Sequence, residues 1–184
     1  MKVSAIIVAL MLWAIIPATA QTTPTPEFKN KVMMLKDNIL SELERTDMRS
    51  SLSTSPMTGR SEISIVANGK TANLKLTGSK EDTYIVKIDP DTDPASTVEL
   101  FKFDESKKER KLLVGKMSLG KDQHVELTKI KISFKKVSDG VYTITADDKL
   151  SDGQYGFIVA RPIITGMSAA NGQALVGYCF AVGS

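Results

Sequence analysis

The stretch from 129 to 160 constrains the fold more tightly than any other part of the chain. Apolar and polar residues alternate on both sides of Ser138-Asp139-Gly140, which is typical of a β-hairpin with one buried face. A three-residue loop at 138–140 would place apolar residues opposite one another, namely Phe134 with Ile144 and Ile132 with Ala146. Because a shift by one residue turns every side chain to the other face, the pattern selects this register, with Gly140 in the left-handed conformation.

A second hairpin is predicted at Asn68-Gly69, a dipeptide that favours a two-residue turn. This turn would again bring apolar residues together on one face, with Ile65 opposite Ala72 and Ile63 opposite Leu74.

Further runs with strand-like composition cover 82–88, 97–103, 110–117, 154–160 and 174–182. Together with the two hairpins they give about nine strands. Parallel strands need long crossover connections, and no helical pattern separates these runs. The predicted fold class is therefore mainly β, an antiparallel β-sandwich or a barrel-like sheet over 61–184, preceded by one amphipathic α-helix.

The predicted helix covers 27–48. Apolar residues recur there at spacings of three and four, as on one face of a helix: Phe28, Val32, Leu35, Ile39 and Leu43. A Pro/Thr linker at 21–26 precedes the helix, and a loop rich in Ser and Thr follows it at 49–60. This face could pack on the chain's own sheet, which we favour, or bind a protein partner.

The first 20 residues have the pattern of a secretory signal peptide. Lys2 precedes an uncharged apolar run at 3–16, and Ala18-Thr19-Ala20 is typical of a cleavage site. The run is short for a membrane span. We therefore expect an extracytoplasmic protein, periplasmic or secreted, with no transmembrane anchor after cleavage.

The charge balance, the single cysteine and the single histidine limit the kinds of binding and catalysis expected of this chain. The chain has 24 Lys and Arg against 21 Asp and Glu, a balance that does not indicate nucleic-acid binding. Cys179 is the only cysteine and alternates with apolar neighbours, so it is predicted as a small buried hydrophobe. His124 is the only histidine, and no serine lies in a nucleophile-elbow motif. No catalytic residue, zinc site or cofactor is predicted.

Three acids at alternate positions, Asp89, Asp91 and Asp93, are the only calcium candidate, because oxygen ligands suit this ion. Pro94 stands where an EF-hand loop has glycine, so a solvated turn is the favoured interpretation and no metal site is predicted beyond this candidate.

A basic stripe runs along the outer side of the hairpin, made of Lys129, Lys131, Lys135 and Lys136. Lysine commonly protects an exposed strand against unwanted pairing, which is the interpretation we favour. Binding to an anionic surface is the alternative.

Two stretches near the C-terminal end carry a recognisable pattern, a turn followed by a strand, Leu150-Ser151-Asp152-Gly153-Gln154-Tyr155-Gly156-Phe157, and a final aromatic strand, Tyr178-Cys179-Phe180-Ala181-Val182. Through them, about the last two thirds of the chain resemble exported bacterial β-sandwich proteins of uncharacterised function. Gln154 replaces the usual glutamate, and Asp152 replaces the usual proline. The resemblance implies the fold and export, and it brings no catalytic residues.

These observations lead us to expect an exported, non-catalytic β-sandwich module that binds a protein or belongs to an envelope assembly. The alternative is a hydrolase of an envelope or extracellular polymer that uses paired carboxylates. The ligand, the pathway and the oligomeric state stay open at this point.

Export makes a first testable prediction. If the signal peptide is cleaved after Ala20, the exported protein should begin at Gln21, in part as the cyclised form. Mass analysis of the N-terminus of exported material checks this, and retention of residues 1–20 would contradict it.

Overall fold

Strands make up most of the chain in the computed structural model, which describes residues 23–118, 121–124, 127, 129–159 and 175–183. The predicted signal peptide lies outside the described residues. In chain order the elements are β1 (Val32–Lys36), β2 (Ile39–Glu42), β3 (Glu44–Ser55), β4 (Arg60–Asn68), β5 (Lys75–Leu76), β6 (Thr83–Lys87), α2 (Pro94–Thr97), β7 (Val98–Glu105), β8 (Glu109–Ser118), β9 (Lys121–His124), β10 (Lys129–Ile130), β11 (Ile132–Ser138), β12 (Val141–Ala146), β13 (Gly153–Val159) and β14 (Leu175–Val182). The expected mainly β, antiparallel class is confirmed, and only the short β5 pairs in parallel, with β14.

Six strands close into a barrel in the order β7-β13-β14-β3-β4-β8. The ring closes because β8 returns to β7, with Asp104 opposite Lys111 and Glu105 opposite Arg110. The edge strands β9 and β10 extend this sheet at β8 and at β7.

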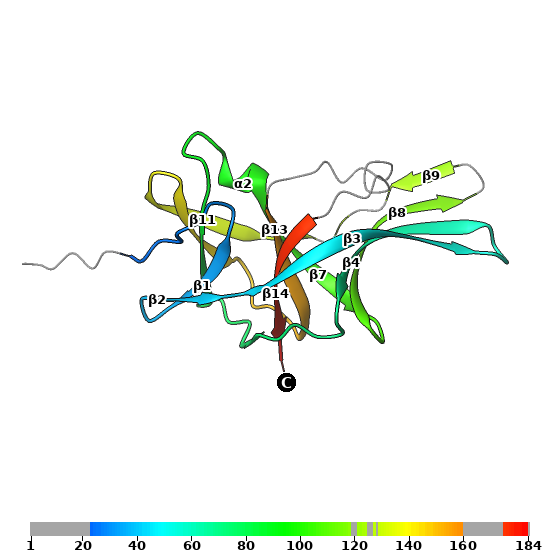
Figure 1. Cartoon of the computed structure of the whole chain (residues 1–184), viewed down its shortest axis with the longest axis horizontal. Coiled ribbons are helices and arrows are strands. Elements are labelled where there is room, and N and C mark those ends of the chain that lie inside the picture. The colour runs from blue at the N-terminus through cyan, green and yellow to red at the C-terminus, as the bar shows by residue number, and fades with distance from the viewer. Residues whose placement is uncertain (1–22, 119–120, 125–126, 128, 160–174, 184) are drawn as a thin grey trace, which may run out of the picture.

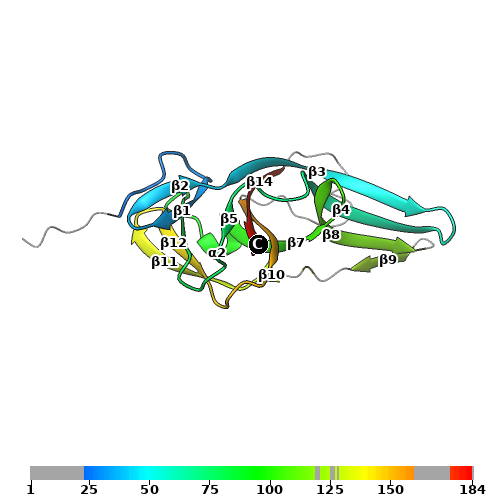
Figure 2. The same cartoon turned by 90° about the horizontal axis from the view of Figure 1, so that it is seen from below.

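A second sheet of five strands has the order β11-β12-β6-β1-β2. It lies at one end of the elongated molecule, and β3, β4, β8 and β9 extend toward the other end (Figures 1 and 2).

Two hydrophobic cores result from this arrangement. One fills the barrel and includes Phe101 and Cys179, and the other lies between the barrel and the five-stranded sheet and includes Leu100 and Phe180. Because neighbouring residues of a strand point to opposite faces, β7 and β14 are buried on both sides. The molecule is therefore both a barrel and a sandwich, the two architectures that sequence analysis left open.

An aromatic cluster joins the two sheets. The ring of Tyr84 on β6 meets Phe157 edge-on with centroids 4.8 Å apart and lies 5.3 Å from Phe180. Tyr155 stacks on Phe180 at 5.6 Å. Such pairs contribute about 0.5–1.5 kcal/mol each beyond the burial of their area, so this cluster stabilises the contact between the sheets.

The hairpin predicted from the alternating pattern is confirmed. Phe134 lies opposite Ile144 and Ile132 opposite Ala146, and the register shifts between Lys136 and Ser138, where an extra residue is accommodated. Gly140 has φ +70°, and a Cβ atom there would meet the carbonyl oxygen of Ile88 at 2.4 Å, so the turn requires glycine.

The amphipathic helix predicted over 27–48 is wrong. This segment forms β1, β2 and the start of β3 instead, and the supposed helix face is divided: Val32 and Leu43 are buried, Leu35 is half-buried, and Phe28 and Ile39 are exposed. The partner-binding helix face therefore does not exist.

A two-residue turn explains why strands form there. Asp37 and Asn38 both have positive φ, 50° and 61°, and they connect Lys36 to its partner Ile39 across a hairpin. Asp and Asn tolerate this conformation better than other residues with a side chain, and the turn matches the twist of the strands. Spacings of three and four in a short apolar segment also fit two strands separated by such a turn.

The hairpin predicted at Asn68-Gly69 is also wrong. Gly69 does turn the chain, with φ +84°, but β4 pairs with β3 on one side and β8 on the other. The segment that follows runs instead to β14, where β5 pairs in parallel. β4 therefore pairs with the strand before it and with the remote strand β8, and not with the segment that directly follows it. The predicted 49–60 loop lies largely within β3.

The hairpin register predicts a contrast between two adjacent positions. Phe134→Asp should lower the free energy of unfolding by about 2–3 kcal/mol, because it places a charge against the core between the sheets. Lys135→Asp changes an exposed side chain and should change the free energy of unfolding by less than about 0.5 kcal/mol. Denaturant unfolding of both variants measures this, and equal effects would contradict the assignment of the faces.

Candidate functional site

A buried ion pair lies inside the barrel, between Glu44 at the start of β3 and Arg110 on β8. Arg110 is 1% exposed, and its Nη2 donates to Glu44 Oε1 at 2.5 Å. The same guanidinium group also donates to two backbone carbonyls of the turn after β4, those of Asn68 at 2.7 Å and Gly69 at 3.1 Å. The pair therefore links two strands that are separated by β4.

The carboxyl group of Glu44 accepts two further hydrogen bonds, from the Thr46 hydroxyl at 2.9 Å and from the backbone N–H of Asn73 at 2.5 Å. Burial by itself would raise the pKa of Glu44, but the hydrogen bonds from Arg110, Asn73 and Thr46 outweigh it and hold the pKa below its ordinary 4.5. Glu44 stays ionised at neutral pH, which suits a structural ion pair.

Gln154 on β13 holds the same end of the barrel. Its side chain is buried, accepts from the N–H of Ala72 at 2.9 Å and donates to Glu105 at 3.2 Å. The segment after β4 is thus fastened by polar groups at Asn68, Gly69, Ala72 and Asn73.

An arm projects beyond the barrel, made of β3 from Arg49 to Ser55, the start of β4, the end of β8 and β9 (Figure 1). Within the described residues, β14 and β7 pair with β3 and β8 only over the parts of these strands nearer the barrel. The last partner of β14 on β3 is Met48, and β7 reaches only as far as Lys111 on β8. β3, β4 and β8 continue to pair with one another beyond these points.

One long edge of the arm is open in the part of the chain that the structure describes. From Arg49 to Ser55, β3 pairs with β4 alone. The side chains along this edge after Arg49 are uncharged, Ser50-Ser51-Leu52-Ser53-Thr54-Ser55, with neither lysine nor proline. Natural proteins usually protect an open edge with charged side chains, proline or bulges, and no described strand pairs with this edge.

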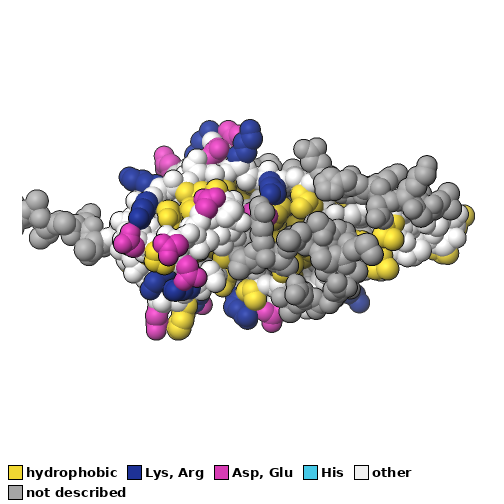
Figure 3. All heavy atoms as spheres, turned by 90° about the horizontal axis from the view of Figure 1, so that it is seen from above, with side chains coloured by type: hydrophobic (Ala, Val, Ile, Leu, Met, Phe, Trp, Pro, Cys, Tyr) yellow, Lys and Arg dark blue, Asp and Glu magenta, His cyan; other side chains and the backbone are white. Residues whose placement is uncertain are grey.

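Apolar side chains are exposed on the same arm. Leu52 is 62% exposed, Met57 in the turn between β3 and β4 is 95% exposed, and Met117 on β8 is 38% exposed. Figure 3 shows hydrophobic atoms at this end of the molecule.

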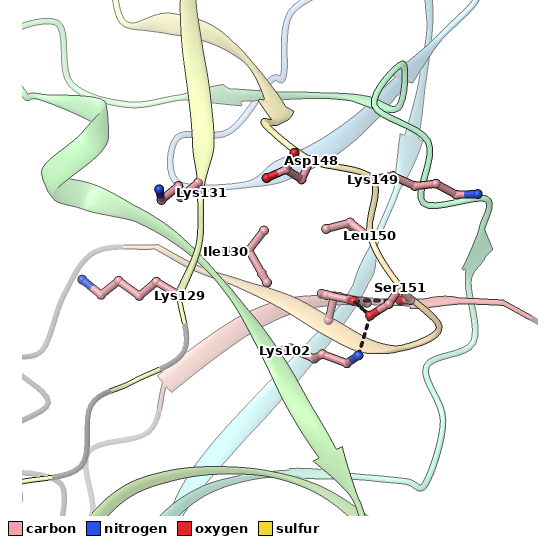
Figure 4. Close-up of a pocket in the computed structure, with 9 residues that line it drawn as sticks. Lys102, Lys129, Ile130, Lys131, Asp148, Lys149, Leu150 and Ser151 are labelled. Carbon is pink, nitrogen blue, oxygen red and sulfur yellow. Dashed lines mark hydrogen bonds between the residues drawn. The ribbon is translucent and has the colours of Figure 1, made fainter.

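A hollow of about 290 Å³ lies where the two sheets meet, and four of its lining residues are lysines: Lys102, Lys129, Lys131 and Lys149. Figure 4 shows Ile130 and Leu150 facing each other across it, whereas Lys129 and Lys131 extend to one side and Lys149 to the other. Lys102 is held against the loop before β13, where its Nζ donates to Ser151 Oγ at 2.7 Å and to the Asp152 carbonyl at 3.0 Å.

The basic stripe predicted from the sequence is divided between these features. Lys129 and Lys131 line the hollow, whereas Lys135 and Lys136 lie on β11, an edge strand of the five-stranded sheet. Lys136 forms an ion pair with Asp139 at 2.8 Å.

A second hollow of about 470 Å³ is lined by the carboxylates Asp37, Glu81 and Asp82. Asp82 accepts from the Thr77 hydroxyl at 3.2 Å and from the backbone N–H of Ser79 at 3.1 Å, which ties it to the shape of its own loop.

The calcium candidates lie in the loop between β6 and α2. Asp93 caps α2 and accepts from the N–H of Ala95 at 3.1 Å, and Asp89 forms an ion pair with Lys29. Within the described ranges, no three His, Cys, Asp or Glu side chains are grouped as metal ligands.

Cys179 lies in the barrel core, 1% exposed, where burial raises the pKa of its thiol to about 11. This matches the predicted small buried hydrophobe. His124 is the last residue of β9, and its backbone pairs with Gly115.

Sequence reasoning missed both the buried ion pair and the arm. Arg110 was counted only as the start of a strand, although an arginine beside an apolar run is a signal for a buried partner. The part of the arm at 49–60 is predicted as a loop because serine and threonine are frequent there, and no apolar alternation around Leu52 indicates a strand.

Comparisons with protein-family models, curated proteins and solved structures each gave no match. No helix among the described residues is long and apolar enough to cross a membrane.

The ion pair makes a prediction about pH. Glu44→Gln should lower the free energy of unfolding by about 3 kcal/mol at neutral pH, because Arg110 then loses its buried counter-charge. Because the pKa of Glu44 is lower in the folded state than its ordinary 4.5, the ionised carboxylate stabilises the fold above pH 4.5. This stabilisation is lost as the pH falls through the folded-state pKa. The difference between the two proteins should therefore narrow below pH 4.5.

Denaturant unfolding at neutral and acidic pH measures both effects. Glu62→Gln is the matched control, because its carboxylate is exposed and lies 3.9 Å from Lys116, and it should cost less than about 0.5 kcal/mol. A cost for Glu44→Gln that does not depend on pH would contradict the role of its charge.

Proposed function

We propose that this chain is an exported, non-catalytic module that binds another protein through its arm. The observation that carries the proposal is the open edge of β3 from Arg49 to Ser55, which lacks the residues that usually prevent pairing. An extended segment of a partner can add to such an edge as a further strand, and its main-chain hydrogen bonds then supply affinity.

The exposed apolar side chains support the same surface. Leu52 lies on the open strand, and Met57 lies at the end of the hairpin that this strand begins. Methionine adapts its shape to a partner at small cost, and an apolar contact beside an added strand gives selectivity that backbone pairing lacks.

Other edges of the molecule are less suitable. β2 has only the four residues Ile39–Glu42, and β11 carries Lys135 and Lys136, so both have features that blunt an edge. The arm is therefore the favoured place for strand addition.

A non-catalytic role is consistent with the described carboxyl groups whose pKa departs from its ordinary value, because each is lowered. The pKa of Glu109 is lowered by its hydrogen bond with Lys111, and that of Asp139 by its hydrogen bond with Lys136. With Glu44, these groups remain ionised, whereas a general acid needs a raised pKa. Export is proposed on the apolar run at 3–16 and the Ala18-Thr19-Ala20 site.

Site-specific cross-linking tests the edge. Cys179 is buried with a raised pKa, so Ser53→Cys supplies a selectively reactive thiol for attaching a photo-cross-linker. The labelled protein, mixed with an exported-protein fraction, should yield one major cross-linked partner. Ser41→Cys on the exposed strand β2 is the matched control and should not yield it.

Leu52→Lys should then reduce capture of that partner at least about tenfold, because it places a charge in the apolar contact. Ile39→Lys alters a side chain of similar exposure, 65%, on β2 and should leave capture unchanged. Equal cross-linking from positions 53 and 41, or equal effects of the two lysine variants, would contradict binding through the arm.

A further inference from the structure

We propose that the lysine-lined hollow between the two sheets is a binding site for a linear acidic polysaccharide. This site is separate from the arm, with which it shares no lining residue, and it does not depend on the proposed protein-binding role.

The hollow lies at a junction of both sheets. Lys102 comes from β7 and Lys129 from β10, whereas Lys131 lies between β10 and β11, where the chain passes from the barrel sheet to the five-stranded sheet. Lys149 belongs to the loop between β12 and β13. Strands β7 and β10 of the barrel sheet and the two connections to the five-stranded sheet thus place the lysines around one hollow, although they are far apart in the sequence.

The positive charge of the hollow is only partly compensated. Asp148, the one acid in the lining, forms an ion pair with Lys80 at 3.2 Å, and Lys129 pairs with Glu99 at 2.6 Å. Lys131 and Lys149 have no ion pair within the described residues. The partners of Lys102 are a hydroxyl and a carbonyl, so its charge also lacks an acidic partner.

Lys102 is held in place by the local structure. Gly153 has φ +148°, and a Cβ atom there would come within 2.7 Å of the Lys102 side chain, so glycine leaves the space that this lysine occupies. The ammonium group also lies 5.6 Å from the centroid of the Tyr155 ring. These contacts place the ammonium group of Lys102 beside the loop before β13 and the Tyr155 ring.

The arrangement favours a chain-like ligand over a single ion. In Figure 4 the ammonium groups of Lys131 and Lys149 extend to opposite sides of the hollow, with Ile130 and Leu150 facing each other between them. Because these two side chains extend in opposite directions, a polymer with repeated carboxylate or sulfate groups suits them better than a single small anion. The C–H faces of sugar rings suit the apolar side chains of Ile130 and Leu150.

The other polyanions fit less well. The exclusion of nucleic acid rests on the proposed export, because an exported protein does not ordinarily meet it. A membrane surface is flat and would not enter the hollow between Ile130 and Leu150, whereas a saccharide chain that carries acidic groups suits the hollow, these apolar side chains and the charge together.

Binding of polygalacturonate to the mature chain tests the proposal, with neutral dextran and anionic phospholipid vesicles as alternative ligands. Calorimetric titration at low salt should detect polygalacturonate alone, and added salt should weaken the binding by screening. The double variant Lys131→Gln/Lys149→Gln should bind about tenfold more weakly, since two uncompensated charges are lost.

The matched control is Lys70→Gln/Lys135→Gln, which removes the same charge from exposed positions outside the hollow. Both double variants are compared at about 0.15 M salt, where the Debye length is about 8 Å, and the control should then change the affinity less than about twofold, because more distant exposed charges are screened. Thermal melts should show both double variants to be folded. Absence of polygalacturonate binding, equal weakening by the two double variants, or preference for vesicles or dextran would each overturn the proposal.

Discussion

The buried pair of Arg110 and Glu44 is the interaction on which the barrel depends. Burying two charges is costly, and here the cost is offset by good geometry and by the further hydrogen bonds to Asn68, Gly69, Asn73 and Thr46. Arg110 lies opposite Glu105 on β7, at the pairing that closes the ring of strands. The ion pair thus joins the first barrel strand in the sequence, β3, to the strand that completes the closure.

Strands β7 and β14 contribute side chains to both hydrophobic cores, one on each side of the strand. Leu100 faces the core between the sheets and its neighbour Phe101 faces the barrel interior, and the same division separates Phe180 from Cys179. These strands lie between two cores, so they are held from both sides. The arm has the opposite character, because β3 from Arg49 onward pairs on one side only in the described chain and has exposed apolar side chains. The first part of β3 therefore packs into the barrel core through Met48, whereas its later part carries the exposed side chain of Leu52.

Errors in the sequence-based predictions have a common physical origin. The alternation around Gly140 predicts the right hairpin because the turn and both strands are adjacent in the chain. The same argument fails at Gly69, because β4 pairs with the preceding strand β3 and with the distant strand β8, so the segment after Gly69 is not its partner. The helix prediction fails for a related reason, since the spacing from Phe28 to Leu43 carries no information about the positive φ angles at Asp37 and Asn38.

Local patterns determined the mainly antiparallel β class, the hairpin register around Gly140, most strands after residue 82 and the burial of Cys179. Alternation and turn chemistry act between near neighbours, so these features can be read from the chain alone. Only the tertiary structure decided that a barrel and a sandwich coexist, that Arg110 meets Glu44, and that lysines from two barrel-sheet strands and two connections surround one hollow. These features depend on which distant strands pair, and that choice is made by the packing and hydrogen bonding of the whole molecule.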